Sequence, residues 1–167
     1  MSAPFDTSDS PWQDWPIDRE IVLGRVIDAP RSLVYAAWTD PDQIKDWFGP
    51  EGMVIDTKEI DLSPGGLWRF DMVTSDGLRY SNRMLFLRME APALIEVEHG
   101  TDQDNDLGRW RMLVTFDEQS DGKTVLTLRQ MHPSKRQREA KLGFGAVVYA
   151  GQTLEKLALH VAKRMAG

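Results

Sequence analysis

His99 is the residue of this 167-residue chain whose type and position best suit acid–base chemistry. It continues an alternation through Ile95 and Val97, which predicts that its side chain lies on the inner face of a strand. A neutral imidazole in a pocket can orient a ligand oxygen or exchange a proton near neutral pH. The structural alternative is a buried His that bonds a backbone carbonyl. Its candidate partner is Tyr80, on a strand with two competing inward sets: Tyr80 and Asn82, or Leu85, Leu87 and Met89.

Three acidic residues lie close together, but their spacing does not fit a metal site. Asp102, Asp104 and Asp106 with Gly108 resemble a calcium loop in which the Gly comes one residue late and Leu113 replaces the final Glu. The pattern favours a solvated hairpin loop. The three His residues are far apart and the chain has no Cys, so no metal site is expected. No P-loop, dinucleotide fingerprint or Ser-His-Asp order is present, and no cofactor is predicted.

Large aromatic and methionine side chains alternate with polar residues along several of the expected strands. Such flat or flexible side chains suit the lining of a cavity for an apolar ligand, and ordinary core packing is the alternative. The residues expected to contact a ligand are Trp47, Phe48, Trp68, Phe70, Met72, His99, Trp110, Met112, Leu128, Gln130, Phe144, Val147 and Val148.

The last part of the chain must close over these strands. Apolar and small residues recur there in steps of three or four, which predicts one long helix over about 134–165. Ser134 and Gln137 fit a capping box at its start. Gly143 and Gly145 would each cost roughly 1 kcal/mol in a helix. The first turns also carry the cations Lys135, Arg136 and Arg138, which the helix dipole disfavours there. Together, the glycines and the cations indicate either a mobile entrance to the cavity or an anionic group nearby. Simple solvent exposure of the cations is the alternative.

The preceding residues are expected to form a strand, two short helices and then six strands in a meander. Asp40 and Pro41 are typical of a helix start, and Asp76-Gly77 and Asp121-Gly122 of hairpin turns. An antiparallel sheet with one covered face must curve around its cover. The fold class is therefore α+β: about seven antiparallel strands, in the order β-α-α-β6-α, wrapped around a long C-terminal helix.

The bulk properties predict one cytoplasmic domain over residues 18–167, preceded by an arm over 1–17. The net charge of -6 argues against nucleic acid and anionic membranes as partners. No apolar run is long enough for a membrane span, and the N-terminus is unlike a secretory signal. Trp12 and Trp15 in the arm predict that it docks on the domain or on a second subunit, so a homodimer is one arrangement that the sequence allows.

Four segments resemble the helix-grip superfamily (START, birch-pollen-allergen-like or SRPBCC), and within it the family named for the activator of the heat-shock-protein-90 ATPase. They are residues 27–38, 40–50, 64–70, and 144–147 together with 152–157. The resemblance runs from about Glu20 to the end. The chain departs from it in two places: many relatives carry Gly-Trp where this chain has Tyr149-Ala150, and some carry a His where it has Gln130.

The resemblance implies a hollow between the sheet and the last helix. It implies three hypotheses for function, because activities differ within the family. The first is binding of a small, mostly apolar molecule such as a lipid or polyketide. The second is a cyclase or dehydratase that uses His99 and Tyr80 in the same cavity. The third, a chaperone partner as co-chaperone, is discounted because only seventeen residues precede the fold where the best-known relatives use a separate domain.

Overall fold

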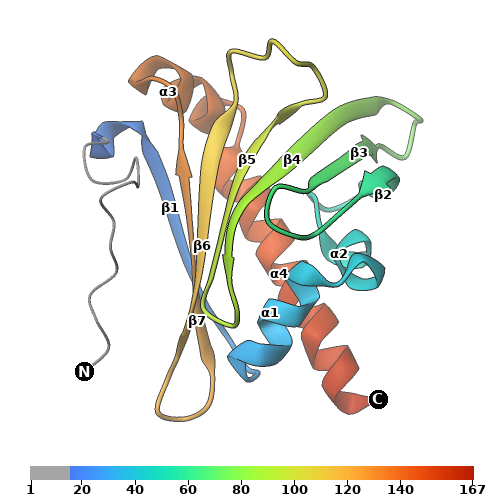
Figure 1. Ribbon diagram of the computed structural model, residues 1–167, viewed down its shortest axis with the longest axis vertical. Helices are drawn as coiled ribbons and strands as arrows, with labels where there is room; N and C mark the ends of the chain where they lie inside the picture. The colour runs from blue at the N-terminus through green and yellow to red at the C-terminus, as the bar shows by residue number, and fades with distance from the viewer. Residues whose placement is uncertain (1–15) are drawn as a thin grey trace.

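The computed structural model describes residues 16–167, and the expected docking of Trp12 and Trp15 lies outside them (Figure 1). A short 3-10 helix, Ile17–Arg19, precedes the first strand. The strands are β1 Glu20–Ile27, β2 Val54–Ile60, β3 Leu67–Val73, β4 Arg79–Glu90, β5 Leu94–Thr101, β6 Trp110–Glu118 and β7 Thr124–Met131. The helices are α1 Arg31–Thr39, α2 Pro41–Trp47, α3 Lys135–Gly143 and α4 Ala146–Ala166.

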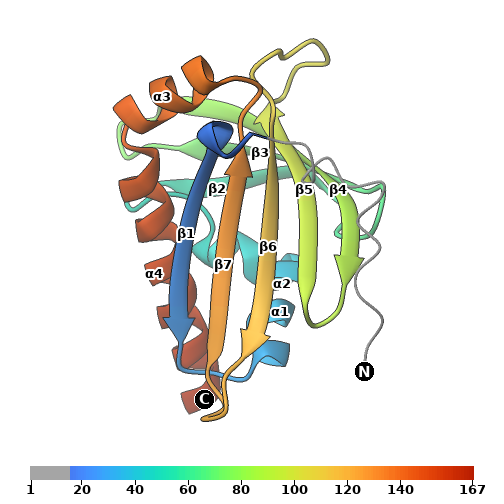
Figure 2. The same ribbon diagram turned by 90° about the vertical axis from the view of Figure 1, so that its left-hand side faces the viewer.

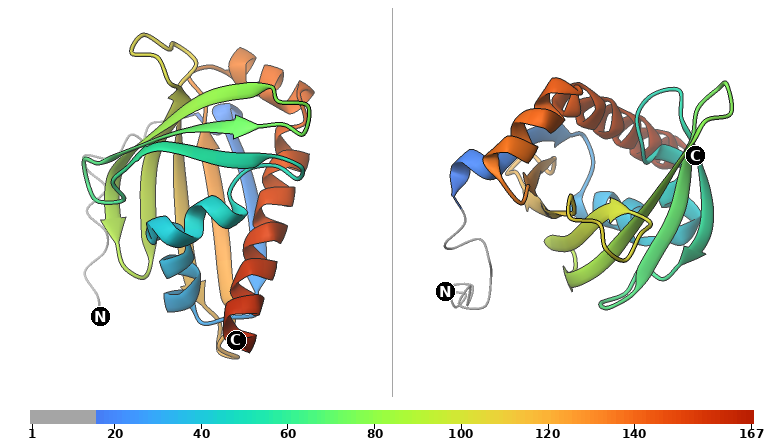
Figure 3. Two further views of the ribbon diagram at one scale, coloured as in Figure 1. Left: turned by 90° about the vertical axis from the view of Figure 1, so that its right-hand side faces the viewer. Right: turned by 90° about the horizontal axis from the view of Figure 1, so that it is seen from above.

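The seven strands form one antiparallel sheet in the order β1-β7-β6-β5-β4-β3-β2. The sheet curves around the helices (Figures 2 and 3): α4 runs along its concave side, α1 and α2 lie toward one end, and α3 lies at the other. The expected α+β helix-grip architecture is confirmed. Within residues 16–167, no helix is both long enough and apolar enough to cross a membrane.

A bulge in β4 resolves the competition between its two inward sets. The pairing of β4 with β5 shifts register between Phe86 and Arg88. Before the shift, Met84 and Phe86 are buried in the core, in phase with Tyr80 and Asn82; after it, Met89 packs on the core. One extra residue reverses the side to which later side chains point. The Tyr80 and Asn82 phase therefore faces inward up to Phe86, and of the other set only Met89 joins the core.

The turn and cap signals are confirmed, except that Gln137 does not complete the capping box, because its side chain donates to the Leu107 carbonyl at 3.5 Å instead. The carboxylate of Asp40 accepts a hydrogen bond from the Asp42 amide at the start of α2, and Ser134 Oγ accepts one from the Gln137 amide at the start of α3. Both hairpin glycines, Gly77 and Gly122, have a positive φ. These residue types were informative because each turn geometry excludes most other side chains.

The prediction of one continuous C-terminal helix is wrong. The helical segment ends at Gly143, and α4 begins at Ala146 after Gly145, whose φ of +88° lies in the left-handed region. The sequence does not indicate the break, because the helical periodicity continues on both sides of it. A single left-handed glycine changes the direction of the backbone without interrupting that periodicity with polar residues. The break turns α3 across the end of the sheet (Figure 1).

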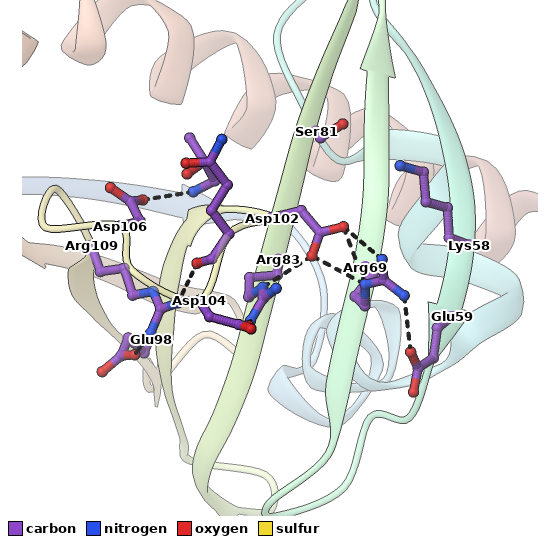
Figure 4. Close-up of polar contacts among 12 residues, drawn as sticks. Lys58, Glu59, Arg69, Ser81, Arg83, Glu98, Asp102, Asp104, Asp106 and Arg109 are labelled. Atoms are coloured by element: carbon purple, nitrogen blue, oxygen red, sulfur yellow. Dashed lines mark hydrogen bonds and ion pairs between the residues drawn. The ribbon is translucent and has the colours of Figure 1, made fainter.

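The acidic segment after β5 is held by arginines on the outer face of the sheet (Figure 4). The buried carboxylate of Asp102 accepts hydrogen bonds from the Arg69 and Arg83 guanidinium groups at 2.9 to 3.1 Å. Asp106 accepts the amides of Thr101 and Gly108, each at 2.8 Å. The segment is thus more ordered than the solvated loop expected, because the partner arginines come from other strands.

The two glycines at the helix break should respond in opposite directions to alanine. Gly143 is helical with open space around its Cβ position, so Gly143→Ala should stabilise the fold by about 0.5–1 kcal/mol. Gly145→Ala places a Cβ at a positive φ and should destabilise it by about 1–2 kcal/mol. Urea unfolding followed by circular dichroism measures both. If both variants are stabilised, the helix is continuous in solution.

Candidate functional site

A pocket of about 380 Å³ lies between the concave face of the sheet, the end of α2 and the helices α3 and α4. Its size is within the range of small-molecule sites. The walls are mostly apolar, with several polar side chains at one end. The lining residues are Trp38, Phe48, Gly49, Pro50, Met72, Tyr80, Asn82, His99, Trp110, Met112, Leu128, Gln130, His132, Lys141, Ala146, Tyr149, Ala150 and Thr153.

The residues expected to contact a ligand fall into three groups. Those at the pocket wall are Phe48, Met72, His99, Trp110, Met112, Leu128 and Gln130, together with Tyr80. Trp47, Trp68 and Phe70 are fully buried in the core behind that wall. The expectation that Phe144, Val147 and Val148 face inward is wrong, because their side chains are 78%, 44% and 62% exposed.

The helix break explains this error. Because α4 starts at Ala146, its pocket face carries Ala146, Ala150 and Thr153, one step away from the apolar pair Val147 and Val148. The deeper turns follow the expected phase, with Leu154 and Val161 buried. The sequence pattern favoured the larger apolar side chains, whereas the structure places small ones where space is left for the pocket.

The apolar wall is held rigid by packed aromatic rings. Trp38 contacts Trp47 edge-to-face at 4.8 Å between ring centroids, and Phe48 contacts Trp68 at 5.2 Å. Trp47 Nε1 donates to the Ala37 carbonyl at 3.1 Å, which locks α1 to α2. Edge-to-face pairs add stability beyond area burial, so this wall is preformed.

His99 is a neutral, hydrogen-bonded group. Asn82 Nδ2 donates to the Tyr80 carbonyl at 2.9 Å, which turns Asn82 Oδ1 toward His99 Nε2, also at 2.9 Å. Nε2 must therefore carry the proton. Burial, and secondarily the charge of Lys141, lower the pKa of His99 to about 3. The imidazole is thus a poor proton acceptor at neutral pH and is suited to orienting a ligand.

His132 and Trp110 carry buried nitrogens without hydrogen-bond partners. Both ring nitrogens of His132 and Nε1 of Trp110 lack a partner within the described chain. Burial, then Lys141 and Arg138, lower the pKa of His132 to about 4. Buried polar atoms without partners are costly, and at a pocket wall they indicate sites for a ligand or water. Sequence reasoning missed Trp38, His132 and Lys141 as pocket residues, and it left the inward direction of Asn82 open; the i, i+2 spacing of Gln130 and His132 was the one available signal for His132.

A larger hollow of about 710 Å³ lies beside Asp46 and the second half of α4. Its lining is charged or polar except for Leu159, which is 63% exposed. Lys156 there donates to the Gly49 carbonyl at 3.2 Å, and His160 bonds Gln43 at 3.0 Å. These side chains already fasten α4 to the α2 region. The smaller, apolar pocket is therefore the better candidate for a ligand site.

A curved antiparallel sheet that encloses an apolar pocket with a C-terminal helix defines the helix-grip class, a fold of the ligand-binding kind. The sequence profile of the family described as "Activator of Hsp90 ATPase homolog 1-like protein" matches residues 28–162. The chain belongs to this family, as the resemblance predicted. No curated protein matches it in sequence.

Solved structures share the fold at low sequence identity. Protein NE0264 of Nitrosomonas europaea superposes with a TM-score of 0.81 at 23% identity, covering 91% of this chain and 99% of that one. The AHSA1 protein of Silicibacter pomeroyi gives 0.72 at 20% identity, covering 87% and 99%. CalU16 of Micromonospora echinospora gives 0.58 at 21%, covering 88% and 78%. At these identities the similarity establishes the fold alone.

The histidines of the pocket should remain neutral in mildly acidic solution. With folded-state pKa values of about 3 for His99 and about 4 for His132, their Hε1 resonances should stay constant from pH 7 to about pH 5. Because both values lie below that of an unfolded His, the stability they contribute is complete above about pH 6.5 and is lost as the pH falls through about 4 for His132 and about 3 for His99.

Proton NMR titration measures these values, with His99→Gln and His132→Gln used to assign the resonances. The urea-unfolded chain is the reference, in which all three His residues should titrate near pH 6.5. A midpoint above about pH 6 for His99 or His132 in the folded protein would contradict their burial.

Proposed function

We propose that the protein binds a small, mostly apolar molecule in the pocket between the sheet and α4. The observation that carries the proposal is the pocket itself: about 380 Å³ of space with aromatic and methionine walls and polar groups gathered at one end. Packed cores contain few voids larger than a water molecule. A hollow of this size in an otherwise packed domain is therefore best explained by a ligand.

The composition of the wall supports an organic ligand. Trp38 and Phe48 present flat rings at the deep end, and Met72 and Met112 can adapt to irregular shapes. Family membership adds that the fold commonly accommodates hydrophobic ligands. Lipids and polyketides have the required combination of an extended apolar body with few polar groups.

The cyclase or dehydratase hypothesis receives less support from the site. It needs a group that can accept or donate a proton near neutral pH. His99 is bonded through Nε2 to Asn82, and its pKa of about 3 keeps it neutral. Tyr80 is 52% exposed at the pocket rim. Binding is therefore the function that the geometry favours.

Binding can be tested with N-phenyl-1-naphthylamine, a neutral apolar dye whose emission rises on leaving water. The wild-type protein should bind it in a saturable way. Ala150→Phe, on the pocket face of α4, should lower the affinity about tenfold or more by filling the space. Val148→Phe, on the exposed face of the same helix, should bind like the wild type.

Two outcomes would overturn the proposal. One is the absence of saturable binding by a folded wild-type protein. The other is equal loss of binding in Ala150→Phe and Val148→Phe, which would place the dye outside the pocket. Circular dichroism of each variant ensures that only folded proteins are compared.

A further inference from the structure

Three rings form a row across the end of the pocket beneath α3. His99 of β5 lies 4.4 Å from Trp110 of β6, and His132, directly after β7, lies 5.9 Å from Trp110 on its other side, both between ring centroids. The strand register sets this row, because His99 pairs with Trp110 and the neighbouring residues Arg111 and Met131 pair with each other. The polar end of the pocket is thus part of the sheet itself.

Two members of the row have hydrogen-bonding capacity that the protein leaves unused. The His132 side chain is buried and lines the pocket, yet neither ring nitrogen has a partner within the described chain. The same holds for Nε1 of Trp110, which can only donate. His99 differs, since Asn82 already occupies its Nε2. The nitrogens without partners therefore belong to Trp110 and His132, not to His99 Nε2.

Lys141 brings a positive charge to the same place. Its Nζ lies 4.7 Å from the centroid of the Trp110 ring, and no ion pair or hydrogen bond of this amine is found within residues 16–167. Arg138, one turn earlier on α3, is already engaged with the Glu20 carbonyl at 2.6 Å and with Glu139 at 3.0 Å. One uncompensated cation therefore faces this end of the pocket.

A carboxylate near this end of the pocket is already engaged by backbone amides. Asp106 is the carboxylate whose charge acts on His99, and its two oxygens accept the Thr101 and Gly108 amides. The pocket end thus combines an indole N–H, an imidazole that can donate one proton, and an ammonium group. The opposite end is lined by Trp38, Phe48 and other apolar side chains, and its one unpartnered buried nitrogen within the described chain is Nε1 of Trp38.

The geometry points to an amphipathic organic monoanion as the ligand: a carboxylate that lies among Lys141, Trp110 and His132, with an apolar body that extends toward Trp38 and Phe48. This inference rests on the proposed function and specifies its ligand class. A carboxylate has two oxygens that together accept several N–H donors, and its single charge matches the single free cation. A neutral amide of the same shape would leave the charge of Lys141 uncompensated. A phosphate monoester would bring more negative charge than Lys141 balances.

The matched probes are 1-naphthaleneacetate and 1-naphthaleneacetamide, which have the same size and differ in charge. Both are measured at neutral pH by displacement of N-phenyl-1-naphthylamine. The wild type should bind the acid more tightly than the amide. Lys141→Met should lower the ratio of the two affinities about tenfold, the loss typical for one charged hydrogen-bonding partner. Lys141→Arg should retain it. Lys135→Met, an exposed lysine on the same helix, should behave like the wild type.

Trp110→Phe tests the indole donor separately and should weaken the acid more than the amide. Dye binding by each variant shows that its pocket is intact. If the dye binds but the wild type does not discriminate between acid and amide, the carboxylate inference is wrong and the proposed function stands. Equal loss of preference in Lys135→Met and Lys141→Met, or tighter binding of 1-naphthyl phosphate than of the acid, also overturns it. If the dye itself does not bind, the proposed function fails first.

Discussion

The structure depends on how one helix covers the apolar face of a curved sheet. Leu154, Leu157 and Val161 are the buried residues of α4, and all lie beyond its first two turns. Toward its start the helix lines the pocket with Ala146, Tyr149, Ala150 and Thr153, two of which are alanines with small side chains. The later turns of α4 therefore pack closely against the sheet, whereas the first turns leave the pocket open. The pocket thus follows from the side-chain sizes along one helix.

Polar contacts fix α4 in the position that keeps this hollow. Gln152 accepts the Glu51 amide at 3.1 Å, Lys156 donates to the Gly49 carbonyl, and His160 bonds Gln43. These contacts tie the helix to α2 and the loop after it rather than to the sheet. On the other side Arg25 of β1 contacts Glu155 of α4, so polar contacts hold the helix from both the α2 region and the sheet.

The two ends of the pocket differ in the polarity of their side chains. The end near α1 and α2 consists of aromatic rings packed edge-to-face, whereas the end beneath α3 gathers His99, Trp110, His132 and Lys141. Strand register sets the row of His99, Trp110 and His132, whereas Lys141 comes from α3, which precedes the break at Gly145.

The sequence by itself determined the fold class, the order of elements, the turns and caps, and the inward phase of Met72, Trp110 and Met112. Strand alternation and turn residues are local, and the chain encodes them directly. Tertiary structure alone decided the bulge in β4, the break before α4, and thereby the exposure of Phe144 and Val147. It also brought His132 and Lys141 to the pocket. These features depend on pairing and packing between segments distant in sequence, which no local period records.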